Sequence, residues 1–397
     1  MQEYKLKVGY DLLYLISCAL HDKVPQKCYV EKMNLEKVYA LAKYHTMQAM
    51  AFHPLDRYSK ENNCPLDLED SKIQSWRIIR QKILQKDLML DLERGKLFDF
   101  FEEKGIGYLP MKGLVLHKLY PKMGWRFLSD NDILFDKTYR REVRDYFKGQ
   151  GYRVGSYKKN VHDVYYKKPF LYFEMHVAFF APHNEDPGVQ RVAEHFRDPW
   201  KWTKRDGDGF SHHLSDEDFY LHSIIAHAYK HTRNGGTGLR TLTDIYVYLT
   251  HKRELDWDYI ASHLEQLQLT EFEKSIKELA FCLFESGEYP SELTDAQQEL
   301  LMFFGTSGAY GSLSTNIATK ITNVSGGEIT FWGKARYVIR RIFPDSFYYR
   351  EYEPFFYKYK ILIPFFWVWR VFRSIFIKGS AAKEIKSLKK IKTDKQA

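Results

Sequence analysis

The stretch MKGLVLHKLYPKMGWRFLSDNDILF, residues 111–135, decides the fold and carries the first chemical signal. Asp130 and Asp132 alternate across Asn131 at the entrance of the apolar run 133–135. On a strand, residues two apart point to the same face, about 6–7 Å apart, so two such carboxylates can hold one or two divalent cations. Because the ligands are oxygens, the pattern favours Mg²⁺ or Mn²⁺ over Zn²⁺. A DxD pair alone is more often a solvated turn.

Three neighbouring features strengthen the metal interpretation. Lys112-Gly113 follows a strand-like run and precedes a helix-like run, a geometry in which backbone N–H groups can face a phosphate. Arg126 lies four residues before Asp130, within reach of the same phosphate. Glu174 lies inside the apolar run FLYFEMHVAFF, where a carboxylate is costly unless it is paired or bound to metal. The sequence therefore predicts three carboxylates that converge on one metal site.

The periodicity of the rest predicts an α+β protein with a small mixed sheet between two helical blocks. Apolar residues recur at spacings of three and four before residue 104 and again from about 215 to 306, and short β-branched and aromatic runs lie between. We expect four segments: a helical region, a sheet-forming core, a second helical region, and an aromatic and basic arm with its tail. They span residues 1–104, 105–210, 211–325 and 326–397.

Local signals predict where several helices begin and end. One long amphipathic helix is expected to end at Gly105, which would take the C-cap position. Ser215 with Asp218, and Thr294 with Gln297, have the spacing of capping boxes.

Composition excludes several classes of protein. The chain has 397 residues, of which 44% are hydrophobic and 28% charged, so wholesale disorder is excluded. Its 4 cysteines form no CxxC pair, which argues against a disulfide scaffold or a cysteine-based zinc site and favours a reducing, cytoplasmic setting. The N-terminus has early acidic residues and no small-residue cleavage site, so we expect no signal peptide.

The net charge of +9 is concentrated at one end of the chain. Residues 334–395 contain 16 Lys and Arg against 5 Asp and Glu, so the remainder is close to neutral. This distribution argues against a specific nucleic-acid surface. The apolar run 361–369 is too short to span a bilayer. Residues 354–378 are therefore expected either to pack on the protein or to make a weak contact with the inner face of a membrane.

Taken together, the motifs resemble a known family. KG, LYP, R-x-x-SD-x-D-I-L and E-x-H resemble the nucleotidyltransferases of the DNA-polymerase-β-like superfamily. More narrowly, they are similar to a poorly characterised bacterial nucleotidyltransferase family found as accessory proteins in cell-surface polysaccharide and peptide-product gene clusters. The resemblance continues through the helical block 221–249 and the C-terminal stretches 340–354 and 361–373.

The resemblance implies roles for individual residues. The metal-binding and catalytic acids would be Asp130, Asp132 and Glu174. The nucleotide-binding residues would be Lys112, Gly113, Arg126 and Ser129. The sequence departs from the superfamily at its usual Gly-Ser turn, because Lys112-Gly113-Leu114 has no hydroxyl to hold a triphosphate.

An acceptor pocket is the third implied feature. Its residues would be His176, His227, His231, Arg240 and Asp244. For His227 and His231, four apart on one helical face, ordinary hydrogen-bonded histidines are the main alternative, and a zinc site would need a third ligand that the spacing does not provide. Arg240 and Asp244 could equally form a cap or an ion pair.

Two classes of function follow. The first is a magnesium-dependent nucleotidyltransferase that moves NMP from an NTP such as ATP to a hydroxyl of an unidentified acceptor, linked to cell-surface polysaccharide or peptide-product biosynthesis. The second is a non-catalytic scaffold or partner protein that has kept the fold. Because all three acids are present, the sequence favours the enzyme.

Overall fold

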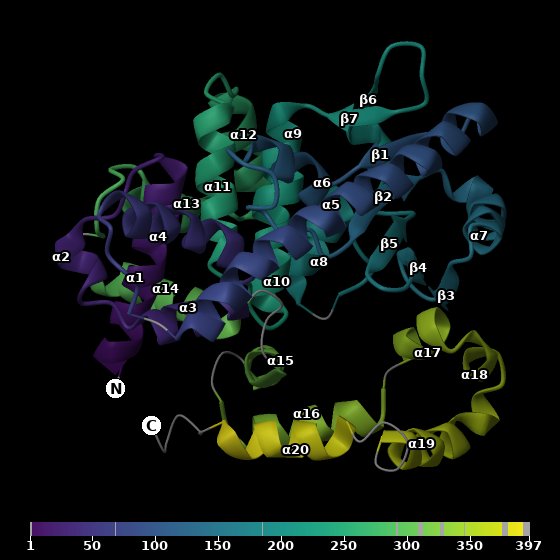
Figure 1. Ribbon diagram of the computed structural model, residues 1–397. Coiled ribbons are helices and arrows are strands. Elements are labelled where there is room, and N and C mark those ends of the chain that lie inside the picture. Colours follow the sequence, from purple (N-terminus) through teal and green to yellow (C-terminus); the bar gives the residue numbers. More distant parts are fainter. Residues whose placement is uncertain are drawn as a thin grey trace. The chain divides into compact units, whose positions relative to one another are not determined.

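The computed structural model describes residues 2–67, 69–184, 186–290, 293–308, 313–325, 329–344, 346–374 and 380–391 (Figure 1). Contacts divide the chain into two units. The first combines Met1–Tyr229 with Gly238–Ala309, and the second combines Lys230–Thr237 with Tyr310–Ala397. The segment boundaries expected near residues 104, 210 and 325 fall inside these units and stay predictions.

A mixed sheet forms the centre of the site-bearing part of the first unit. Its strands are β1 (Tyr108–Pro110), β2 (Asn131–Phe135), β3 (Arg153–Ser156), β4 (His162–Lys167) and β5 (Leu171–His176). Their order is β1-β2-β5-β4-β3, in which β2 and β5 are parallel and the other neighbours are antiparallel. A separate hairpin pairs β6 (Thr203–Arg205) with β7 (His212–Leu214). The small mixed sheet predicted from the sequence is confirmed.

Helices precede and follow this sheet, as the α+β prediction requires. They belong to the first unit, except for residues 230–233, which belong to the second. Before the sheet lie α1 (Gln2–Leu20), α2 (Lys27–Val30), α3 (Leu35–Tyr44), α4 (Gln48–Glu61) and α5 (Asp70–Lys104). Among the strands lie α6 (Gly113–Leu116), η1 (His117–Leu119), η2 (Lys137–Tyr139) and α7 (Arg140–Gly149). After the sheet come α8 (Pro187–His195), η3 (Pro199–Trp202), α9 (Asp216–Phe219), the π-helix η4 (Tyr220–Ala226), α10 (His227–Arg233), α11 (Arg240–His251), α12 (Trp257–Leu267), α13 (Thr270–Phe284) and α14 (Asp295–Ser307).

The expected helix ends are borne out. The helix α5 runs to Lys104, and Gly105 follows it with φ +67°, a left-handed conformation that glycine adopts without strain. Ser215 caps α9 by accepting the backbone N–H of Asp218. Thr294 and Gln297 form a reciprocal capping box at the start of α14. Each cap satisfies backbone groups that a helix terminus would otherwise leave unpaired.

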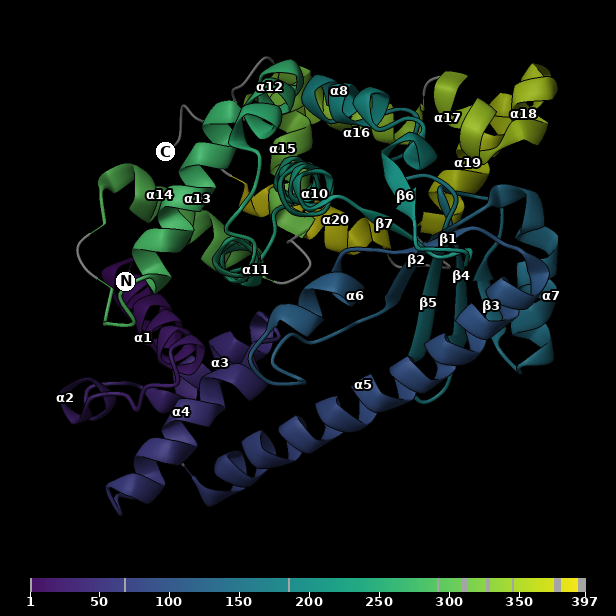
Figure 2. The same ribbon diagram turned by 90° about the horizontal axis from the view of Figure 1, so that it is seen from above.

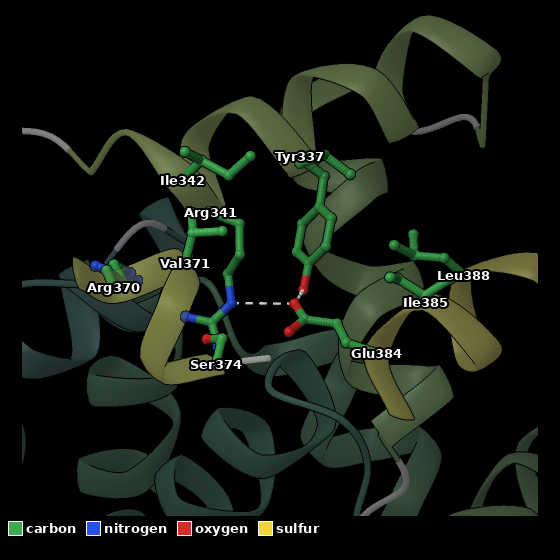
Figure 3. Close-up of a pocket in the computed structure, with 10 residues that line it drawn as sticks. Tyr337, Arg341, Ile342, Arg370, Val371, Ser374, Glu384, Ile385 and Leu388 are labelled. Atoms are coloured by element: carbon green, nitrogen blue, oxygen red, sulfur yellow. Dashed lines mark hydrogen bonds and ion pairs between the residues drawn. The ribbon is translucent and has the colours of Figure 1, made fainter. Parts of the chain in front are cut away.

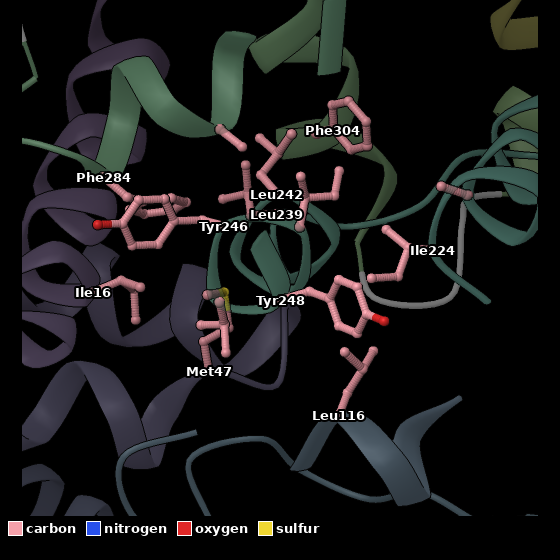
Figure 4. Close-up of a cluster of buried hydrophobic side chains, with 14 of the residues drawn as sticks. Ile16, Met47, Leu116, Ile224, Leu239, Leu242, Tyr246, Tyr248, Phe284 and Phe304 are labelled. Carbon is pink, nitrogen blue, oxygen red and sulfur yellow. The ribbon is translucent and has the colours of Figure 1, made fainter. Parts of the chain in front are cut away.

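Two hydrophobic cores hold the first unit together. One joins α1, α4, α11 and α13, and contains Tyr246, Tyr248 and Phe284 (Figure 4). The other joins α5 and α7 to one face of the sheet, where Leu97 and Phe101 of α5 meet Phe135 of β2. Burial of such large side chains contributes about 1.5–3 kcal/mol each. The long helix α5, which both views show beside the strands, therefore fixes one side of the sheet (Figure 2).

The second unit is helical in its described part. It contains α15 (Leu313–Ser325), α16 (Phe331–Ile342), α17 (Ser346–Tyr352), α18 (Pro354–Lys358), η5 (Lys360–Leu362), α19 (Ile363–Phe372) and α20 (Ser380–Lys390). Glu384 of α20 accepts hydrogen bonds from Tyr337 and Arg341 of α16, beside a cavity of about 230 Å³ (Figure 3). This polar contact, and the packing of Leu388 against the small core that contains Tyr337, join α20 to α16.

None of the helices in the described part of the chain combines the length and the apolar character needed to cross a bilayer. The apolar arm instead forms short helices in the second unit. Phe366 of α19 is buried against aromatic neighbours, whereas Ile361, Phe365 and Val368 are 84%, 72% and 71% exposed. Apolar side chains on this scale of exposure are a candidate surface for an apolar partner.

A buried carboxyl on α5 produces a testable pH dependence. Asp87 is 1% exposed, and neither of its oxygens has a hydrogen-bond partner in the described part of the chain. Burial raises the pKa of this carboxyl to about 6. Asp87 therefore binds a proton more tightly in the folded state than in the unfolded state. The stability that the neutral carboxyl contributes is lost as the pH rises from about 4 to about 6.

We expect Asp87→Asn to raise the melting temperature at pH 7.5, because the amide has nearly the same volume and carries no charge. The gain should correspond to about 1–3 kcal/mol and should shrink as the pH falls toward 4. Thermal unfolding across this pH range measures it, with exposed Asp99→Asn on the same helix as the control. A gain that is independent of pH would contradict the assignment.

Candidate active site

Strand alternation separates an apolar face of the sheet from a polar face. On β5, Phe173 and Met175 pack in the core under α5, so Glu174 and His176 point to the opposite face. On β2, Ile133 packs in that same core and Asp132 lies on the opposite face. The polar residues of the site are thus held by a rigid sheet whose other side is fully packed.

Strand pairing brings these polar residues together. Asp132 of β2 lies beside Glu174 of β5 in the parallel register. In the antiparallel hairpin, His162 of β4 lies opposite His176 of β5. Cross-strand neighbours on one face have Cβ atoms about 4.5–5.5 Å apart. The expectation that the DxD strand and the strand with Glu174 are adjacent is confirmed.

Hydrogen bonds and ion pairs fix the orientation of the acids. His176 Nε2 donates to Asp132 Oδ1 at 2.8 Å, and Lys112 Nζ lies 3.4 Å from the same oxygen. Ser129 Oγ donates to Asp130 Oδ1 at 2.8 Å. Two sets of contacts result, one around Asp132 and one between Ser129 and Asp130. The charges of Asp132 and Lys112 act on Asp130, so these predicted site residues lie near one another.

The electrostatics of the three acids are unequal. Burial, followed by the charges of Asp132 and Glu174, raises the pKa of Asp130 to about 6. Burial also acts to raise the pKa of Asp132, but the ammonium of Lys112 and the bond from His176 outweigh it, so this pKa is lowered. The pKa of Glu174 is likewise lowered, because the imidazole of His176, whose Nε2 lies 3.7 Å from Glu174 Oε2, acts against burial. Asp130 is the acid whose negative charge the protein compensates least.

The glycine turn is shaped by close packing. Lys112 has φ +44°, a left-handed conformation that is strained for a residue with a side chain. A Cβ atom on Gly113 would lie 2.7 Å from Nη1 of Arg126 and 3.1 Å from Leu128, closer than side chains tolerate. Gly113 is therefore required so that the Arg126 guanidinium can lie against the turn.

Arg126 is also held by a buried ion pair. Its Nε and Nη2 donate to the two carboxylate oxygens of Asp244 at 2.7 and 2.9 Å, and Tyr120 donates to Asp244 at 2.7 Å. A bidentate pair of this kind positions both partners. Asp244, predicted for the acceptor pocket, thus anchors Arg126, while Arg126 Nη1 lies against the turn at Gly113.

The remaining predicted pocket residues lie on α10 and α11. Arg240 donates to Thr46 and to the carbonyl of Phe127, at 3.0 and 3.2 Å. His227 and His231 both lie on α10. Among the described residues, the His and acidic side chains whose ligand atoms all lie within 4.8 Å of one another are His162, Glu174 and His176. Neither Asp130 and Asp132 nor the two histidines of α10 belong to that group.

His162 is a site residue that the sequence interpretation missed. A signal for it exists, because a hairpin centred on Pro169 places residues 162 and 176 opposite each other. That signal depends on the register of the hairpin, which aromatic and β-branched runs alone do not fix.

A family model for an uncharacterised nucleotidyltransferase matches residues 31–285. The chain belongs to this nucleotidyltransferase family. The match contains the sheet, the three acids and the Lys112-Gly113 turn. No curated protein and no solved structure matches the chain.

The buried ion pair under the turn gives a prediction about stability. Asp244→Asn keeps the volume of the side chain but leaves the Arg126 charge uncompensated, and loss of one partner of a buried pair costs about 3–5 kcal/mol. Tyr120→Phe removes only one hydrogen bond and should cost about 0.5–1.5 kcal/mol. Thermal and urea unfolding of both variants measures the difference. Equal, small losses in the two variants would show that the pair does not stabilise the turn.

Proposed function

We propose that this protein is a divalent-metal-dependent nucleotidyltransferase that moves NMP from an NTP to a hydroxyl of an acceptor and releases pyrophosphate. The observation that carries the proposal is the group formed by Asp130, Asp132 and Glu174 beside the Lys112-Gly113 turn. Membership of the nucleotidyltransferase family supports a nucleotide as one substrate.

The chemistry of the three acids fits a divalent cation such as Mg²⁺ or Mn²⁺, because their oxygens are hard ligands of the kind these ions prefer. Side-chain movement would bring Asp130 and Asp132 into one ligand group with Glu174, which they do not form among the described residues. The raised pKa of Asp130 supports the fit, since it reflects negative charge that the surrounding residues do not fully compensate. When bound, the metal would neutralise phosphate charge and lower the pKa of an attacking hydroxyl.

Cationic groups beside the acids suit the phosphates of the nucleotide. Lys112 Nζ, already within 3.4 Å of Asp132, would move its charge to a phosphate oxygen once the acids are neutralised. Asp244 accepts hydrogen bonds from Nε and Nη2 of Arg126. The remaining Nη1, which lies against the turn at Gly113, would donate to the same phosphates. Ser129 would act by orienting Asp130. Charge stabilisation of this kind is the main protein contribution to phosphoryl-type transfers.

Proton transfer from the acceptor hydroxyl needs a basic group near neutral pH. A cation bound to Asp130 would lower the pKa of that carboxyl, so its raised pKa does not make it the base. Glu174, one of the three catalytic acids predicted from the sequence, would take this proton.

The acceptor is proposed only as a class, a hydroxyl compound linked to cell-surface polysaccharide or peptide-product biosynthesis in the bacterial cytoplasm. Asp244 binds Arg126, and Arg240 donates to the carbonyl of Phe127, so both residues would shape the acceptor pocket indirectly. His227 and His231 stay predictions for its lining. A non-catalytic scaffold is disfavoured, because it has no need to hold three acids together against their mutual repulsion.

Replacement of each acid by its amide tests the proposal. We expect Asp132→Asn, Asp130→Asn and Glu174→Gln each to lower transfer by at least about 100-fold, beyond the 10–100-fold typical of losing a group that only supports a metal ligand. Transfer is measured as label passing from α-labelled ATP, or each other NTP, to material in a lysate of the source cell. Asp136→Asn, at the other end of β2, is the control.

Stability separates loss of chemistry from loss of fold. Asp130→Asn removes a charge that the folded state disfavours, so its melting temperature in metal-free buffer should equal or exceed that of the native protein. If Asp130→Asn and Asp132→Asn together retain full transfer, the acids do not serve the reaction.

We further propose that residues 354–378 contact the anionic inner face of a membrane. The exposed Phe365, Val368 and Trp369 of α19 would enter the interface, and nearby Lys358 and Lys360 would attract acidic lipids. This exposed face favours the interfacial alternative over an arm packed entirely within the protein.

Co-sedimentation with phosphatidylserine vesicles tests the contact. The full-length protein should pellet with the vesicles at low salt and be released at about 0.5 M salt, because screening weakens the attraction. Phe365→Ser combined with Trp369→Ser should abolish pelleting without changing the melting temperature. Trp332→Ser, on the exposed surface of α16, is the control. Pelleting that is absent, or unchanged in the double variant, would contradict the proposal.

A further inference from the structure

The polar face of the sheet carries nitrogen ligands as well as carboxylates. His162 and His176 project from opposite strands of one hairpin, with Glu174 on the same face. Glu174 Oε2 lies 3.7 Å from Nε2 of His162 and 3.7 Å from Nε2 of His176. One carboxylate oxygen therefore faces both imidazoles.

These separations are somewhat longer than those between ligands of one bound cation. One ligand atom from each of the three residues can be chosen so that all lie within 4.8 Å of one another. Two ligands bound to a metal at about 2.0–2.2 Å lie about 3–3.6 Å apart at octahedral to tetrahedral angles. Small side-chain adjustments would close the shell, and the paired strands keep the backbone positions fixed.

The two nitrogens of each ring have different surroundings. The nitrogen nearest Glu174 is Nε2 in both rings, so Nε2 would be the ligand atom. The Nδ1 atoms of His162 and His176 are buried and have no hydrogen-bond partner in the described part of the chain, so neither ring is committed to another group through Nδ1. Each ring can therefore carry its proton on Nδ1 while Nε2 binds an ion.

We propose that His162, Glu174 and His176 form a mixed nitrogen and oxygen site for a first-row transition-metal ion, and that this site selects Zn²⁺ over Mg²⁺. Imidazole nitrogen suits Zn²⁺ and its neighbours in the series, whereas Mg²⁺ demands oxygen ligands and keeps much of its water. The site goes beyond the proposed transfer reaction. It shares Glu174 with the acids of that reaction, and a carboxylate can bridge two ions through its two oxygens.

The existing contacts of His176 are compatible with this ion. In the structure, His176 Nε2 donates its hydrogen to Asp132 Oδ1. Coordination through Nε2 displaces that hydrogen, and the ring then carries its proton on Nδ1 or releases one to solvent. Asp132 Oδ1, 2.8 Å from Nε2, is within reach of the same ion as a fourth ligand.

Calorimetric titration of the metal-stripped, full-length protein with Zn²⁺ and with Mg²⁺, without nucleotide, tests the inference. We expect one equivalent of Zn²⁺ to bind at least 100-fold more tightly than Mg²⁺. His162→Gln should weaken Zn²⁺ binding at least tenfold and change Mg²⁺ binding by less than threefold. His213→Gln, an exposed histidine on β7, is the matched control and should change neither.

X-ray absorption at the zinc edge gives a readout that does not depend on affinity. The native protein should show two imidazole ligands per zinc, and His162→Gln should show one. Equal affinity for Zn²⁺ and Mg²⁺, or an unchanged imidazole count in His162→Gln, would overturn the inference. Since no nucleotide is present, these outcomes do not depend on nucleotidyl transfer, whose failure would appear in the labelling experiment instead.

Discussion

The repulsion among three carboxylates that share one largely buried corner of the sheet is the constraint on which the site depends. Parallel pairing of β2 with β5 sets Asp132 beside Glu174, and Asp130 lies close enough for both charges to raise its pKa. The surrounding residues compensate the negative charges unequally. Lys112 and His176 both contact Asp132, whereas Asp130 accepts one hydrogen bond, from the hydroxyl of Ser129. The strained backbone at Lys112 fits this arrangement, since strain is retained where it serves a site.

The two faces of the sheet have different roles: the apolar face stabilises the fold, and the polar face carries the site. Its apolar face is packed beneath α5 and α7, so the polar face can hold charged groups without loss of the fold. The ion pair between Arg126 and Asp244 adds a second support, because it fixes Arg126, which lies against the glycine turn, to α11. A site assembled on paired strands is positioned more tightly than one built on loops alone.

Local and periodic features could be predicted from the sequence. The end of α5 at Gly105 and the caps at Ser215 and Thr294 depend on backbone groups within a few residues, and the shared face of Asp132 and Glu174 follows from strand alternation. Two contacts between distant residues could not be predicted from the sequence. The Arg126–Asp244 pair joins residues 118 apart in sequence, and His162 enters the site only through the register of the β4–β5 hairpin. The position of α11 and the hairpin register are set by packing of the whole domain, which no single motif encodes.

We propose that the three acids hold a divalent cation at which a nucleotide binds. Anomalous scattering from crystals grown with Mn²⁺ and a non-hydrolysable ATP analogue would locate both. We expect a manganese peak bonded to Asp130 and Asp132, with the phosphates of the analogue beside Lys112 and Gly113. Ordered nucleotide at another place in the protein, with no manganese at these acids, would contradict it.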